Sequence, residues 1–289
     1  MKKTIIAAAI ATVIAAPAMA DVSVSGVVEQ SFEKVDVDTM DDWNGYTDSG
    51  LTFKASEDLG NGLTAFAQIS LDTDNQDSAT RIGNSEKDSK VGIKGGFGTV
   101  VVGRMEDFTE GVMAATMTLN GTGAIELGGN ATRNNGAVAY VSPTVNGVHV
   151  AMAGNNDGTA TGMFNNKEIL VAYANGPLNV MASKVDVKDN SDMTSLYASY
   201  AIGDAKVSAM TVDRDYDAGQ GTDARDSMYR LDYTMGSNVV TVGTRDAEAT
   251  ADDMDIVKLT HKLSKRTAVW VGHRNKGTGY AGDVTHFGM

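Results

Sequence analysis

The sequence predicts an all-β protein of the transmembrane antiparallel β-barrel class, with sixteen strands. Three observations lead to this class: alternating apolar and polar segments, turns that alternate in length, and a leader for export. Turn residues separate segments near 22–34, 50–58, 63–73, 88–95, 99–105, 134–142, 147–154, 167–175, 178–187, 194–202, 205–214, 226–235, 238–247, 255–263, 266–274 and 283–289. Short periplasmic turns at one rim and long extracellular loops at the other are typical of such barrels.

The clearest alternation lies in the two hairpins of residues 51–104. After the Gly-rich turn at 60–62, one face of the next strand is apolar and the other is mostly polar. The apolar face carries Leu63, Ala65, Ala67, Ile69 and Leu71. A strand with one apolar and one hydrated side fits a barrel wall, but it also fits a soluble β-sandwich.

The first 20 residues are predicted to be a secretory signal peptide. Lys2 and Lys3 precede an apolar run over residues 5–15, and the small residues at 18–20 form a cleavage site before Asp21. We therefore expect a mature barrel domain over residues 21–289. The apolar run is too short for a transmembrane helix, and no later segment approaches the roughly 18 apolar residues that one needs.

Composition excludes several functional classes. The formal net charge is −13 at pH 7 and becomes two units more negative without Lys2 and Lys3, which argues against nucleic-acid binding. The chain has no Cys, so it has neither disulfides nor a thiolate metal site. The four histidines are scattered, without metal spacing or a companion nucleophile. We therefore expect no metal, no cofactor and no enzymatic activity.

Several cations lie opposite the apolar face of their own strands. They are Lys54, Lys90, Lys94, Arg133 and Lys258. An inward charge is costly in a dry sandwich core but is well hydrated in a water-filled lumen, so the pattern favours a barrel. The alternative is a secreted or surface-exposed soluble β-protein, acting as a binding or adhesion module, in which these cations face solvent.

One connection is much longer than the others. Between Arg104 and Arg133 lie 28 residues, and a loop of that length is usually functional or disordered. Asp107 and Glu110 form a helix start, and the apolar residues at 108, 112, 115 and 119 share one helix face. We expect this loop to fold against the inside wall, where its acids face the inward cations. These acids are Glu106, Asp107, Glu110 and Glu126.

Five motifs in order carry a family resemblance. They are LTFKASEDLGNGL at 51–63, KVGIKGGFGTVVVGR at 90–104, RNNGAVAYVSP at 133–143, HKLSKRTAVWVGHRNKG at 261–277 and DVTHFGM at 283–289. Along essentially its whole mature length the chain resembles the general diffusion porins of the Gram-negative outer membrane. The resemblance implies a homotrimer of sixteen-stranded barrels in outer-membrane lipid. It also implies a third extracellular loop folded into the lumen, and a water-filled channel for passive diffusion of small hydrophilic solutes and ions.

The resemblance also implies which residues line the constriction. The segment 125–129 is similar to the loop motif of the family, which makes Glu126 the candidate loop carboxylate. On the wall, Arg133 and Lys90 match two family cations, and Lys54 and Lys94 share their inner face.

The chain departs from the family pattern at three places. Thr122 stands where the family has a second loop acid, and Gly50 stands where it has a third wall arginine. Because Thr122 leaves the loop with one acid fewer, we expect no strong cation selectivity. Family members end in an aromatic residue, whereas this sequence ends in Phe287, Gly288 and Met289. The last predicted strand is also shorter than the roughly 9–11 residues that span a bilayer, so we expect a truncated C-terminal strand.

Overall fold

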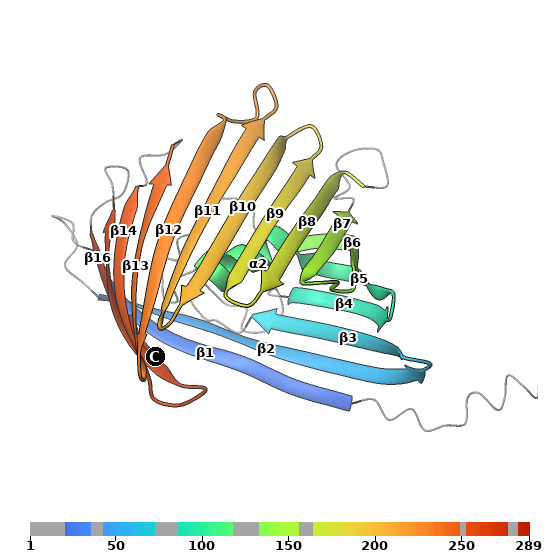
Figure 1. Ribbon diagram of the computed structural model, residues 1–289, viewed down its shortest axis with the longest axis horizontal. Coiled ribbons are helices and arrows are strands. Elements are labelled where there is room, and N and C mark those ends of the chain that lie inside the picture. Colours follow the sequence, from blue (N-terminus) through green and yellow to red (C-terminus); the bar gives the residue numbers. More distant parts are fainter. Residues whose placement is uncertain are drawn as a thin grey trace, which may run out of the picture.

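The computed structural model describes residues 21–35, 43–72, 86–117, 133–155, 164–248, 253–276 and 283–289. These ranges form sixteen strands and one helix, α2 (Figure 1). The predicted leader at 1–20 and the predicted loop carboxylate Glu126 lie outside the described residues. No helix in the described ranges is long and apolar enough to cross a membrane.

The strands follow one another along the chain with short turns and longer loops between them. Their bounds are β1 (Asp21–Val35), β2 (Trp43–Gly60), β3 (Leu63–Asp72), β4 (Glu86–Gly95), β5 (Gly98–Glu106), β6 (Arg133–Val141), β7 (Val148–Asn155), β8 (Asn166–Asn175), β9 (Leu178–Val187), β10 (Ser191–Ile202), β11 (Ala205–Tyr216), β12 (Ala224–Met235), β13 (Asn238–Ala247), β14 (Met254–Lys262), β15 (Ala268–Lys276) and β16 (Val284–Gly288). The helix α2 (Phe108–Met117) lies between β5 and β6.

Each strand pairs antiparallel with its neighbours in sequence, and β1 pairs with β16 to close the ring. The predicted fold class, a closed sixteen-stranded antiparallel barrel, is confirmed. Two strands that are eight positions apart, such as β4 and β12, lie on opposite walls of the barrel. A closed ring leaves no open side in the strand order, which suits a sheet that lies in lipid.

Most strands begin and end within a few residues of the prediction, but β2 is longer. It begins at Trp43, whereas the alternation predicts a start near residue 50, because Trp43 still pairs with Lys34 of β1. The tight turns have the expected backbone. Asn61 and Gly62 have φ of 53° and 76°, a region that Asn and Gly enter at least cost and that a tight hairpin turn needs.

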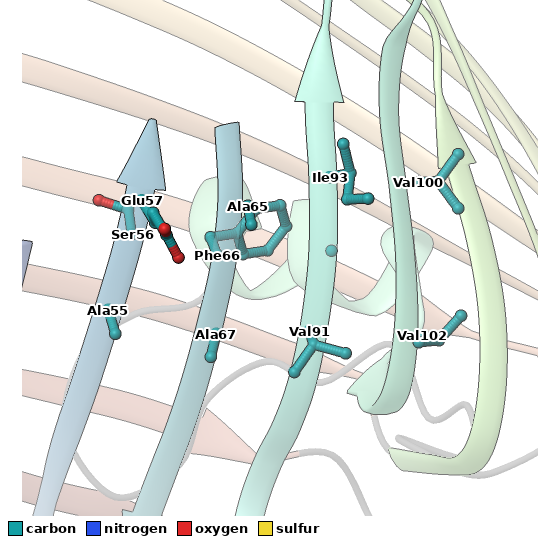
Figure 2. Close-up of a pocket in the computed structure, with 11 residues that line it drawn as sticks. Ala55, Ser56, Glu57, Ala65, Phe66, Ala67, Val91, Ile93, Val100 and Val102 are labelled. Carbon is teal, nitrogen blue, oxygen red and sulfur yellow. The ribbon is translucent and has the colours of Figure 1, made fainter. Parts of the chain in front are cut away.

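The outer surface of the barrel is mostly apolar. Residues directly opposite each other on paired strands share a face. One outward row consists of Ala55, Ala67, Val91 and Val102. The next consists of Glu57, Ala65, Ile93 and Val100. Between these rows the small alanines leave a shallow groove of about 490 Å³ (Figure 2). The wall therefore presents apolar surface to its surroundings, as a transmembrane barrel requires.

The buried apolar cluster lies inside the barrel. It joins α2 to the inner faces of β7 to β12 and β14 and includes Met117, Ala151, Leu170, Met181, Tyr197, Met210, Val212, Met228, Met254 and Ile256. Met210 of β11 and Met228 of β12 are directly opposite each other and are 1% and 0% exposed. The helix thus covers one part of the inner wall.

Candidate functional site

The helix of the long loop is bound to the wall at its first turn. It begins at Phe108, directly after Asp107, as the sequence predicts. The carboxylate that accepts its N-terminal amides is Glu168 of β8, which the sequence did not point to. The Phe108 amide donates to one oxygen at 2.8 Å, and the Thr109 amide donates to the other at 2.6 Å. Asp107 instead accepts a hydrogen bond from the side chain of Asn134 on β6.

Two of the four predicted apolar positions of α2, at 108 and 112, pack on the inner wall. Phe108 and Val112 contact the buried methionine-rich cluster, and Met117 at the end of the helix belongs to it. Residue 119 lies outside the described residues. The helix is therefore held by a carboxylate at one end and by apolar packing along its length.

A network of charges lies on the inner wall of β3 to β6. Its centre is Asp88, whose carboxylate accepts hydrogen bonds from Lys90 at 3.0 Å and from Gln68 at 3.1 Å. The guanidinium of Arg133 lies 3.9 Å from the other oxygen of Asp88 and 3.0 Å from Glu106. Two predicted wall cations and one predicted loop acid thus meet in one network, at the base of the long loop. The sequence interpretation overlooked Asp88.

Other predicted site residues lie outside this network. Lys54 and Lys94 are exposed on the inner face, with Lys54 opposite Gln68 and Lys94 opposite Thr64. Within the part of the chain that the structure describes, neither lysine has a carboxylate within 4 Å. Glu110 lies half-buried in the first turn of α2. The role of Glu126 stays a prediction, because it lies outside the described residues.

A second set of ion pairs lies on the inner wall of β11 to β15 and β1. Arg214 and Arg245 both contact Asp226, at 3.1 Å and 3.2 Å. Arg274 of β15 reaches across β16 to Glu33 of β1 at 2.8 Å, and both side chains are buried. Cross-strand register brings these partners together. The alternation alone places them on the inner face but does not pair them, which is why the sequence could not identify the set.

Lys258 of β14 lies on the same part of the inner wall, and it is one of the inward cations that the sequence predicted. Its ammonium lies 5.2 Å from the centroid of the Trp270 ring, a distance at which a cation is attracted to an aromatic face. Asp232 lies in the same row as Lys258, and Arg230 donates hydrogen bonds to both of its oxygens, at 2.9 Å and 3.1 Å. The inner wall thus carries fixed charges on opposite sides of the barrel, where they act on ions that pass between them.

Comparisons with known proteins agree with this architecture. The family model described as Gram-negative porin matches residues 7–278. Outer membrane porin protein 32 of Delftia acidovorans is 27% identical over 308 residues, which cover 93% of this chain and 88% of that protein. A major outer membrane protein P.IB of Neisseria gonorrhoeae is 37% identical over 115 residues, or 36% of this chain and 32% of that protein.

Solved structures show the same fold. An anion-selective porin from Comamonas acidovorans has a TM-score of 0.69 at 23% identity, covering 93% of this chain and 98% of that one. OmpF of Salmonella typhi in complex with daunomycin has a TM-score of 0.76 at 14% identity, covering 92% and 96%. The alternative of a soluble binding module is not favoured by these relatives. The chain belongs to the Gram-negative porin family and is an outer-membrane channel for the passive diffusion of small solutes.

Proposed function

We propose that the channel is narrowest between α2 and the wall of β3 to β6. The observation that carries this proposal is the network of Lys90, Asp88, Arg133 and Glu106 at the base of the loop. A solute that passes α2 must pass this charged wall, because the helix covers the inner face of the strands on the other side.

The channel prefers small anions to small cations, and the preference is modest. Lys90 and Arg133 are each neutralised by acids at 3.0 Å. Lys54 and Lys94 lie on the same inner face without a carboxylate within 4 Å in the described residues, so they leave a positive potential. One of the similar structures is named an anion-selective porin, which supports the same direction here.

The protein assembles as a homotrimer, and lipid covers the rest of its outer surface. The contact surface in this proposal is the apolar groove on the outside of β2 to β5 (Figure 2). Its rows of alanines flanked by Val91 and Ile93 let a second apolar surface approach closely. Replacement of Ala55, Ala65 and Ala67 by leucine is expected to weaken the trimer, measured as monomer on unheated detergent gels.

The experiment that tests the proposed function is a recording from the purified protein in planar bilayers under a salt gradient. We expect stepwise channel openings and a reversal potential of the sign that marks anion preference. A cation-preferring reversal potential contradicts the proposed selectivity, and an absence of conductance steps contradicts a channel altogether.

A further inference from the structure

The carboxylate of Glu168 is bound on several sides by the first turn of α2. Glu168 is only 5% exposed, and besides the two backbone amides it accepts a hydrogen bond from the Thr109 hydroxyl at 2.5 Å. That hydroxyl also lies 2.7 Å from the Ser183 hydroxyl of β9. Because Thr109 gives its single proton to Glu168, Ser183 is the donor in this second pair. Two neighbouring strands, β8 and β9, therefore both form hydrogen bonds with Thr109 of the helix.

The helix itself compensates the charge of Glu168. In the described ranges no cation lies within 4 Å of this carboxylate. The positive end of the helix dipole and three donors take the place of a cation. The nearby acids Glu106 and Asp107 line the same small cavity but are bound by Arg133 and Asn134. The buried charge is thus satisfied only while α2 lies in its present position.

The other attachment of α2 does not fix its position with equal accuracy. Met117 packs among methionines of the wall, including Met210 and Met228. Apolar attraction has no direction, and the unbranched methionine side chain adapts to shifted neighbours. The patch therefore attracts the helix to the wall, whereas the directional bonds to Glu168 determine where it begins.

We propose that Glu168 is a positioning residue of the channel, which fixes the place where the loop leaves the wall and so keeps the passage at constant width. This inference rests on the proposed constriction between α2 and the wall. Loss of one hydrogen bond to a buried carboxylate increases the population of displaced helix by about tenfold to a hundredfold. The measurable consequence is a channel that fluctuates between conductance levels.

The test compares three variants in planar bilayers. Glu168→Gln keeps the side-chain size but presents an amide N–H₂ to the donors of α2, and Thr109→Val removes only the hydroxyl. The matched control is Glu248→Gln, because Glu248 also accepts a backbone amide hydrogen bond, from Arg225 at 3.0 Å, but lies on the rim away from α2. We expect flickering sublevels in Glu168→Gln, a smaller effect in Thr109→Val, and recordings like the unmodified protein in Glu248→Gln.

A reversible disulfide distinguishes a loss of helix positioning from a misfolded variant. The chain has no Cys, and the hydroxyls of Thr109 and Ser183 are in contact, so Thr109→Cys with Ser183→Cys places two thiols within disulfide reach. Added to Glu168→Gln, the disulfide is expected to restore steady current, and dithiothreitol is expected to bring the fluctuation back in the same channel.

The outcomes distinguish this inference from the proposed function. Steady current in Glu168→Gln, or fluctuation that the disulfide does not suppress, overturns the positioning role even if the channel has the proposed selectivity. Conversely, fluctuation that follows the redox state supports the role of Glu168 whichever ion the channel prefers, because it reports the position of α2 and not the sign of the wall potential.

Discussion

Lys90 donates a hydrogen bond to Asp88 at 3.0 Å, two residues earlier on the same inner face of β4. An acid thus lies among the cations of the proposed constriction and neutralises part of their positive charge. Removal of the Asp88 charge changes the electrostatic potential of the wall while the size of the side chain stays the same.

Asp88→Asn is expected to shift the reversal potential towards anions. The substitution leaves Lys90 and Arg133 with less compensation, and an added unit charge a few ångströms from a passing ion is worth about 0.5–1 kcal/mol in water. That energy corresponds to a change of about twofold to fivefold in the permeability ratio. Bilayer recordings under a salt gradient measure it. The control is Asp204→Asn, at a short turn away from the network, and an equal shift in both variants would argue against a local effect.

The methionine cluster predicts a stability effect inside the lumen. Met228→Ala removes a fully buried side chain opposite Met210 and is expected to lower the unfolding free energy by about 2–5 kcal/mol. Met228→Leu conserves volume and should cost less than about 1.5 kcal/mol. The temperature at which the barrel unfolds on detergent gels measures both. Met152→Ala, on the outer face and 44% exposed, is the control, and an equally large loss there would contradict a packed inner cluster.

The buried pair of Arg274 and Glu33 predicts an effect on barrel closure. The two side chains join β15 to β1 across β16, and they are 5% and 8% exposed. Arg274→Met leaves a buried carboxylate without its partner and is expected to destabilise the barrel by about 3–5 kcal/mol. The double variant with Glu33→Gln should recover most of that loss. Urea unfolding followed by tryptophan fluorescence compares them, and an unimproved double variant would show that the pair is not the cause.

The fold followed from local patterns in the sequence. Alternation with period two assigns each side chain to one face, and Gly-rich turns fix where hairpins reverse, so the strand count and the inward placement of Lys90 and Arg133 were predictable. Phe108 and Val112 also lie on the packed face of the helix, as their spacing indicated.

The contacts that anchor the loop could not be predicted in the same way. Thr109 and Glu168 are 59 residues apart in the sequence, and their hydrogen bond depends on where α2 lies against the inner wall. The methionines of β11, β12 and β14 occupy inward positions, which alternate along each strand with outward ones. Periodicity therefore placed Met228 inside the barrel, but it did not show that a helix would cover it. Likewise, Asp88 occupies an ordinary inward position, and only the cross-strand register places it next to Arg133.

In our proposal the wall beside the loop base sets the ion preference of the channel, and the reversal potential of Arg133→Glu is the decisive measurement. This substitution removes a cation that lies 3.0 Å from Glu106 and adds a carboxylate at the proposed constriction. The comparison is Arg225→Glu, which makes the same change on the extracellular rim, where Arg225 pairs with Asp213. A shift towards cations in Arg133→Glu that clearly exceeds the shift in Arg225→Glu is the predicted result. An unchanged potential in Arg133→Glu would contradict the account.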